Sequence, residues 1–131
     1  MYKPTFSPKN KLEESLVSLM NGEIDMASFL KIFLSEDVYI ASAREGDGQG
    51  LGIEPLLFQR ESELQLAVFT ASENMEAFKE RAPVCLKLKG NQLIGKLSEN
   101  YGLVLNPSLT AGFELPHSGI LAIRQDFKDY F

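Results

Sequence analysis

The residue types that most often carry chemistry are few in this chain, which narrows the sites it can form. His117 is the only histidine and Cys85 the only cysteine, so a two-histidine metal site, a cysteine zinc cluster and an internal disulfide are excluded. His117 could act as a general base, and Glu114 lies close to it in the sequence. No serine, cysteine or acid, however, is spaced to form a catalytic relay with it. A capping or surface role is the favoured interpretation of His117.

Cys85 lies in "VCLKLK" (84–89), where Lys87 and Lys89 fall on the same face of a predicted strand. Two nearby ammonium groups can lower the pKa of a thiol. The segment resembles no known nucleophile motif, and an isolated small thiol usually serves packing. We therefore interpret Cys85 as a structural residue.

Three pairs of acidic residues are further candidates for acid–base chemistry. Helical periodicity places the first and last pairs on exposed helix faces and the middle pair at a helix-to-strand junction. We expect all of these carboxylates to be solvated and none to form a site. The pairs are Glu13-Glu14, Glu36-Asp37 and Asp126-Asp129.

The segment "EGDGQGLG" (45–52) has glycines at positions 46, 48, 50 and 52, which invites comparison with phosphate-binding loops. Such loops lead directly into a helix, and the P-loop adds a Lys-Ser/Thr pair. Here the glycines precede "IEPLLF" (53–58), which is strand-like and contains Pro55. We predict a mobile hairpin loop that binds no nucleotide.

The stretch "GLVLNPSLTAGFELPHSGI" (102–120) joins one apolar run to the next. Asn106 precedes Pro107, which predicts an extended backbone at Asn106, and its side chain can bond nearby amides in an Asx-type turn. Glu114 comes just ahead of a predicted helix, where the helix dipole favours a negative charge. We expect Asn106 and Glu114 to act chiefly on stability.

The loop over residues 107–113 lies at the carboxyl end of a predicted buried strand, where open α/β sheets usually bind ligands. Ser108, Thr110 and Gly112 in this loop are small and have no evident structural duty. The residues predicted to contact a ligand or partner are Ser108, Thr110, Gly112 and His117.

Two short helices are predicted near the N-terminus, after a loose arm over residues 1–7. Ser7-Pro8 offers an N-cap and a first-turn proline for a helix that ends at Asn21-Gly22, and Asp25 can cap the next helix. From residue 38 the pattern becomes that of an antiparallel meander. Its predicted strands are 38–43, 53–59 and 64–71.

The second half alternates helices with strands. Thr70 and Glu73 have capping-box spacing for a helix. Strand 84–89 alternates apolar and polar residues, which indicates one wet face or an edge position. The predicted helices are 73–81, 91–100 and one beginning near Pro116.

The apolar runs at 66–70 and 102–105 predict the central strands, because "LVL" (103–105) has no polar member and therefore suits a strand covered on both faces. Right-handed crossovers would make the later strands parallel. The predicted fold is a single α/β domain, residues 1–131, with one mixed β-sheet flanked by helices. In that sheet an antiparallel meander is followed by β-α-β crossovers.

The composition argues against two classes of partner, nucleic acids and membranes. The net charge is −5, with Lys and Arg scattered among the acids, so no basic stripe is present to bind a nucleic-acid backbone. The first residues lack the apolar core of a signal peptide, and no apolar run approaches the roughly 20 residues that span a bilayer. We expect a cytoplasmic protein that binds neither nucleic acid nor membrane.

Three motifs carry a resemblance to a known family: "LAVFTA" (66–71), "GLVLNP" (102–107) and "FELPHSGI" (113–120). They resemble the N-terminal domain of the SseB family, named for enhanced serine sensitivity, over roughly residues 26 to 127. The resemblance implies an α/β fold in a bacterial protein and carries over no catalytic residues. Where the family often has a doubled proline after Glu-Leu, this chain has Pro116-His117.

Two hypotheses of function follow. The first is a non-enzymatic protein- or peptide-binding regulatory module without a cofactor, in which a strand edge at Pro55 or Lys87-Lys89 accepts a peptide. The second is a small-ligand binder or enzyme that uses the strand-end loops around Asn106, Glu114 and His117. A deep pocket lined by these three residues would favour the second, and a shallow surface with an exposed apolar patch the first. A homo-oligomeric structural role is a third possibility, and enzymatic activity and oligomeric state are left open.

Overall fold

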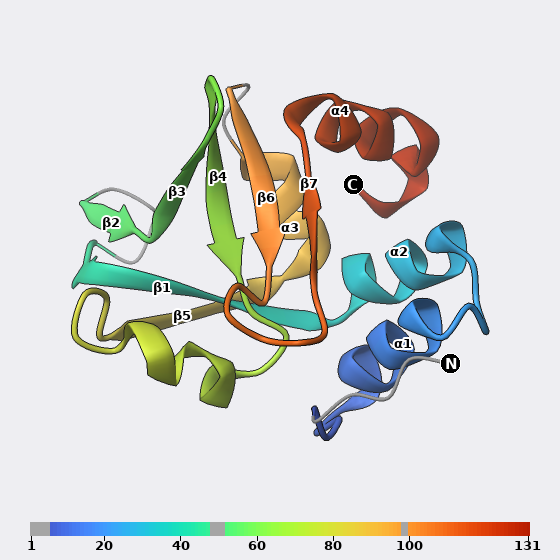
Figure 1. Ribbon diagram of the computed structural model, residues 1–131. Coiled ribbons are helices and arrows are strands. Elements are labelled where there is room, and N and C mark those ends of the chain that lie inside the picture. The colour runs from blue at the N-terminus through green and yellow to red at the C-terminus, as the bar shows by residue number, and fades with distance from the viewer. Residues whose placement is uncertain (1–5, 48–51, 98–99) are drawn as a thin grey trace.

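The computed structural model describes residues 6–47, 52–97 and 100–131, which form a mixed α/β fold as predicted (Figure 1). The helices are α1 (Lys11–Met20), α2 (Met26–Ser35), η1 (Ser72–Phe78), α3 (Gly90–Lys96), α4 (His117–Asp126) and η2 (Lys128–Tyr130), where η marks a 3-10 helix. The strands are β1 (Asp37–Glu45), β2 (Ile53–Pro55), β3 (Leu57–Arg60), β4 (Glu63–Val68), β5 (Val84–Lys89), β6 (Tyr101–Leu105) and β7 (Phe113–Leu115).

Short polar side chains cap the first two helices. Asp25 caps α2 as predicted, with its Oδ1 accepting a hydrogen bond from the backbone N–H of Ser28 at 2.8 Å. The predicted N-cap at Ser7-Pro8 is wrong, because α1 begins only after Asn10, whose Oδ1 accepts from the backbone N–H of Glu13. Phe6, in the predicted loose arm, packs against the core.

The strands of the described residues form two linked sheets rather than the single sheet predicted. Sheet A has the order β2-β1-β5 and sheet B the order β3-β4-β6-β7. The segment predicted as one strand over 53–59 is divided at Leu56, which bonds Ala41 of β1 and Ala67 of β4. A second link joins Tyr39 and Phe69, which exchange backbone hydrogen bonds of 2.9 and 2.8 Å.

The predicted antiparallel pairing in the meander is confirmed for β1 with β2 and for β3 with β4. The predicted central strands are also confirmed, since β4 and β6 pair in parallel at the middle of sheet B. Leu103 and Leu105 are each 1% exposed.

The predicted parallel pairing of strand 84–89 is wrong. β5 pairs antiparallel with β1 at the edge of sheet A. The alternation of half-buried and exposed residues along β5 matches the predicted wet face. A strand with one wet face fits an edge, whereas the position beside β4 requires residues that are covered on both faces, and β6 supplies those.

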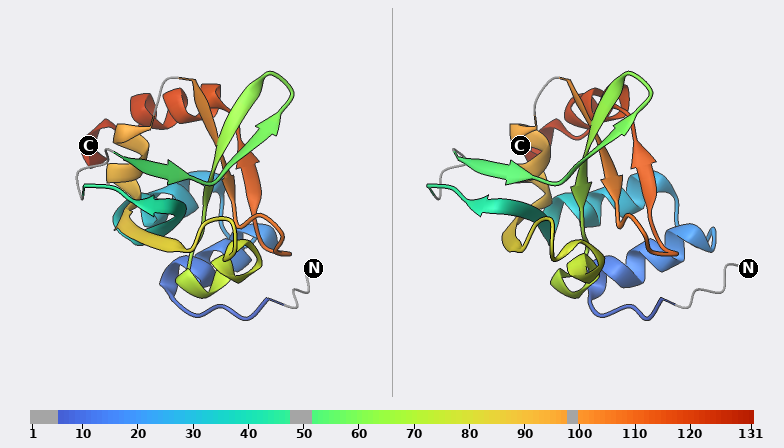
Figure 2. Two further views of the ribbon diagram at one scale, coloured as in Figure 1. Left: turned by 90° about the vertical axis from the view of Figure 1, so that its left-hand side faces the viewer. Right: turned by 60° about the vertical axis from the view of Figure 1, so that its left-hand side comes forward.

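The two faces of the sheets are covered unequally. The helices α1, α2, α3 and α4 pack on one face, in a core that includes the fully buried Phe29, Ile94 and Ile120. On the other face η1 covers one end with Met75 and Phe78. Figure 2 shows the β3–β4 hairpin projecting beyond the helices.

The glycine-rich loop connects β1 and β2, which form the predicted antiparallel hairpin. Gly46 and Gly52 at its ends have φ of +71° and +83°, a conformation that glycine adopts without strain. Gly48 and Gly50, on which the prediction of a mobile loop without a nucleotide depends, lie outside the described residues.

Candidate functional site

His117 and the loop predicted to form a contact surface with it lie at opposite ends of β6. The loop begins directly after Leu105, the last residue of β6, whereas His117 Nδ1 lies 3.1 Å from the carbonyl oxygen of Tyr101, the first. β7 runs antiparallel to β6 and carries the chain from one end to the other (Figure 1). Ser108 and Thr110 are exposed. Their contact with a partner stays a prediction, but His117 does not share their surface.

Gly112 has a structural reason to be glycine. A side chain at this position would meet the carbonyl oxygen of Leu105 and lie 3.2 Å from that of Asn106. The backbone on both sides of the loop therefore packs too closely for a Cβ atom. Its proposed contact role likewise stays a prediction.

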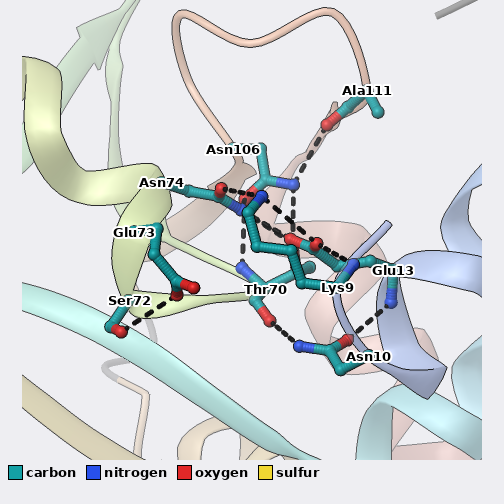
Figure 3. A network of polar contacts seen from close by, with 9 residues as sticks. All are labelled: Lys9, Asn10, Glu13, Thr70, Ser72, Glu73, Asn74, Asn106 and Ala111. Carbon is teal, nitrogen blue, oxygen red and sulfur yellow. Dashed lines mark hydrogen bonds and ion pairs between the residues drawn. The ribbon is translucent and has the colours of Figure 1, made fainter. Parts of the chain in front are cut away.

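Asn106 anchors the start of this loop, but not in the predicted extended conformation. Its φ is +52°, in the left-handed region that asparagine tolerates better than most residues. Its carboxamide donates to Thr70 Oγ1 at 2.9 Å and to the carbonyl of Ala111 at 3.0 Å, and accepts from the backbone N–H of Thr70 at 3.0 Å (Figure 3). These bonds outweigh the preference of a residue before proline for extended backbone.

Glu13 joins the same cluster, contrary to the prediction that it is solvated. Its carboxylate is 0% exposed. Oε2 accepts from Thr70 Oγ1 at 2.7 Å and Asn74 Nδ2 at 2.6 Å, and Oε1 accepts from the backbone N–H of Lys9 at 2.9 Å. The Lys9 ammonium lies 3.6 Å from Oε1 and compensates the buried charge. Glu14, its neighbour, is exposed as expected.

Thr70 is the centre of this cluster rather than the cap of the following helix. Its hydroxyl donates to Glu13 and accepts from Asn106 and Asn74, so the predicted capping box with Glu73 is wrong. The residue before η1 is Ala71, which makes no side-chain cap bond. The pKa of Glu73 is held below its ordinary value, chiefly by its own backbone N–H and then by the Ser72 hydroxyl.

We call Glu13, Thr70, Asn74 and Asn106 the buried polar cluster. A threonine hydroxyl 2.7 Å from a carboxylate is the geometry of a nucleophile and its general base. Glu13 and Thr70 are each 0% exposed, however, so no substrate reaches the hydroxyl. The cluster instead joins α1, the carboxyl ends of β4 and β6, and η1 (Figure 3).

The sequence signal that identifies Glu13 is its spacing from Asn10. An Asn-x-x-Glu pattern is a capping box, in which the third helical residue turns its side chain back toward the helix start. The carboxylate accepts from Lys9, just before the cap, and reaches Thr70 from there.

Glu114 lies in β7, just ahead of α4 as predicted, but its carboxylate pairs with Arg60 and another carboxylate lies at the helix start. Glu114 pairs with Val104, and its Oε1 lies 3.4 Å from Arg60 Nε. The carboxylate at the start of α4 belongs to Glu63, whose Oε1 accepts from the backbone N–H of His117 at 3.1 Å. Sequence reasoning missed Glu63 because it reaches the helix from β4, more than fifty residues away in the chain.

A comparison with protein families decides the identity. Residues 12–122 match the model of the SseB protein N-terminal domain. The chain belongs to the SseB family. No curated protein and no solved structure matches the chain significantly.

The matched span of this SseB domain extends further toward the N-terminus than the three motifs suggested. It begins at Leu12 instead of near residue 26. It therefore includes most of α1 and all of the buried polar cluster. The cluster is thus built from residues within the family domain.

The edge strand β5 presents a different kind of surface. Val84, Leu86 and Leu88 are half-buried, while the alternate residues Cys85 and Lys87 are exposed. Lys89 is also exposed and lies 3.1 Å from Asp37 of β1. Within the described residues, β5 has a strand neighbour on one side only. Pro55, the other predicted edge, lies in the three-residue strand β2 at the opposite side of sheet A.

Cys85 does not have the lowered pKa that its lysine neighbours suggested. Partial burial raises the pKa of the thiol. Burial, followed by the nearby Asp37, also raises the pKa of Tyr39 on β1. A thiol with a raised pKa is a poor nucleophile at neutral pH. Cys85 is nevertheless exposed, so the predicted packing role is wrong.

In residues 6–47, 52–97 and 100–131, no three histidine, cysteine, aspartate or glutamate side chains come close enough to hold a metal ion. Among the described helices, none has the length and hydropathy needed to cross a membrane.

Proposed function

We propose that this SseB domain is a protein-binding module that takes up an extended segment of its partner as an extra strand beside β5. The observation that supports it is the unpaired side of β5 in sheet A. An exposed strand edge offers a row of backbone donors and acceptors, and strand addition satisfies them.

The side chains of β5 indicate the sequence of the partner segment. The row of Val84, Leu86 and Leu88 is half-buried, and Leu86 and Leu88 touch the main core. Apolar side chains on an added strand would continue this row and remove more of it from water. On the other face Lys87 is exposed and has no ion-pair partner within the described part of the chain. The expected partner segment therefore alternates apolar and acidic residues.

The lysines also disfavour pairing of two β5 strands with each other. Two copies of this edge would bring lysines together, and like charges on paired strands are destabilising. An acidic partner segment meets no such repulsion. The same charges thus keep the edge free and select its partner.

The alternative of a small-ligand site around Asn106, Glu114 and His117 receives no support from their arrangement. Asn106 is 1% exposed and fully engaged with its neighbours. Glu114 is exposed in β7, and His117 starts α4 beyond the far end of that strand. The three residues do not line a common pocket.

The test is affinity capture from cells of the native bacterium, with Lys87→Glu compared with Lys79→Glu. Lys79 is also an exposed lysine but lies after η1, away from β5. We expect Lys87→Glu to lose the captured partner and Lys79→Glu to keep it. Hydrogen exchange of the recovered complex should show new protection of backbone amides in β5. A partner that both variants retain, with unchanged exchange in β5, would refute the proposal.

A further inference from the structure

The side-chain carboxamide of Gln65 lies on the part of sheet B that η1 leaves uncovered. Gln65 of β4 is 4% exposed. Its side chain makes no hydrogen bond within the described part of the chain. Among the described residues only Asn21 Oδ1 is a fully buried side-chain polar atom without a partner, so the amide atoms of Gln65 remain accessible from the hollow that it lines. Water or a ligand in the hollow can complete their hydrogen bonds.

The strand register places Gln65 among charged residues on this face. Arg60 pairs with Glu63 and Phe58 with Gln65, so all four side chains lie on one face of the β3–β4 hairpin. Gln65 is level with Gly102 of β6, and Glu114 of β7 is level with Val104. Gly102 has no side chain, and a Cβ atom there would meet the Glu63 carboxylate, which therefore lies over Gly102 beside Gln65.

An ion pair spans this hollow. Arg60 and Glu114 belong to the two outer strands of sheet B, and Arg60 Nε lies 3.4 Å from Glu114 Oε1. The pair therefore reaches across β4 and β6, the strands that carry Gln65 and Gly102. Both side chains are largely exposed, at 65% and 43%. An exposed pair of this kind contributes little to stability and exchanges its partners readily.

The hollow has a volume of about 290 Å³ and an excess of negative charge. Three carboxylates, those of Glu61, Glu63 and Glu114, line it together with a single guanidinium, that of Arg60. One oxygen of Glu63 is engaged by the backbone N–H of His117, which fixes the carboxylate in place. The surface thus offers several acceptors around one buried carboxamide.

We propose that this hollow binds an organic cation bearing a guanidinium or ammonium group. The guest donates to the free oxygen of Glu63, to Gln65 Oε1 and to Glu114, which exchanges Arg60 for it. A guanidinium suits the site best because its donors are spread around a plane and can serve several acceptors at once. Arg60 itself shows that a guanidinium fits beside Glu114. The site does not involve β5 and is independent of peptide uptake there.

The experiment is a titration of the whole isotopically labelled chain, followed through the side-chain NH₂ signals of Gln65 by NMR. The probes are methylguanidinium, its neutral isostere methylurea, and a capped Gly-Arg-Gly peptide. We expect methylguanidinium to shift the Gln65 signals saturably and methylurea to leave them in place. A response to the peptide as well assigns the site to an arginine side chain of a partner. A response to methylguanidinium alone assigns it to a free organic cation.

Two variants and a matched control complete the test. Gln65→Met keeps the length of the side chain without the amide, and Glu114→Gln removes an exposed charge without disturbing the fold. Each should weaken methylguanidinium binding at least about tenfold, the effect of losing a hydrogen bond to a charged group. Glu54→Gln breaks a similar exposed pair, Arg44 Nε to Glu54 Oε1 at 2.8 Å, outside the hollow, and should change nothing.

For the variants, binding is followed through the backbone amides of β4. The proposal is overturned if methylguanidinium causes no saturable shift, if methylurea acts equally, or if both variants bind as the wild type does. Arg60→Met should have the opposite effect on affinity. Because it removes the guanidinium that already lies in the hollow, it should raise the affinity for methylguanidinium.

Discussion

Replacing Asn106 by alanine should lower the free energy of unfolding by about 3–7 kcal/mol, the largest effect expected from the loop after β6. The substitution removes the partners of the Thr70 N–H and the Ala111 carbonyl, which belong to residues that are each 0% exposed. Each buried group left unpaired costs about 1–3 kcal/mol. Alanine must also adopt the φ of +52° that asparagine holds here, which adds about 1 kcal/mol.

The assay is urea unfolding followed by circular dichroism, and a second substitution separates the two contributions. Asn106→Gly loses the same hydrogen bonds but accepts the left-handed conformation without strain. It should therefore be about 1 kcal/mol more stable than Asn106→Ala. Glu114→Ala serves as the control, because its exposed pair with Arg60 contributes about 0–1 kcal/mol.

A loss smaller than about 1 kcal/mol for Asn106→Ala would show that water or a rearranged side chain replaces the carboxamide. In that case the side chain of Asn106 would not hold the ends of β4 and β6 together. Equal stability of the alanine and glycine variants would refute only the strain contribution.

Two further predictions concern the core and the helix caps. Phe69→Ala should cost about 3–5 kcal/mol by urea unfolding, since Phe69 is 0% exposed; Val104→Ala, at a half-buried position, should cost only about 1 kcal/mol. The pKa of Asp25 is lowered from 3.8, chiefly by hydrogen bonds from Ser28, so its ionised carboxylate stabilises the fold above that pH and less as the pH falls below it. The melting-temperature difference between the wild type and Asp25→Ala should accordingly be constant near neutral pH and shrink below pH 3.8; a difference that stays the same down to acid pH would contradict this.

Much of the core could be predicted because its signal is local and periodic. The uninterrupted apolar run of β6 distinguishes a strand covered on both faces from the alternating β5, which has one wet face. The helix caps at Asp25 and the stop at Asn21-Gly22 depend on a few adjacent residues in the same way. Such features follow from residues within one or two turns of each other.

The pairing of β5 could not be predicted from the same signals. Alternation shows that one face is wet, but it does not show which strand lies alongside. Sequence order suggested that β5 pairs beside β4, yet the chain passes through sheet A before it returns to sheet B as β6. The alternatives differ only in contacts between segments far apart in the chain, where β1 rather than β4 supplies the partner.

Glu13 illustrates a second limit, since its neighbour Glu14 looks the same in sequence and is exposed. A carboxylate is usually solvated, because burying its charge without partners is strongly unfavourable. Glu13 is buried because Thr70 and Asn74 bring their donors from positions about sixty residues away. No local pattern can reveal donors that the tertiary fold supplies.

The position of the buried polar cluster bears directly on where this domain can act. The carboxyl ends of adjacent parallel strands are the usual ligand site of an open α/β sheet, and β4 and β6 are the parallel pair here. Glu13 and Asn74 fill the space beyond these ends, and Thr70 and Asn106 direct their polar groups to them instead of to a ligand. With that place occupied from within, the two surfaces that we propose for partners are the edge of sheet A and the uncovered face of sheet B. These are the two places where Lys87 and Gln65 lack partners within the described chain.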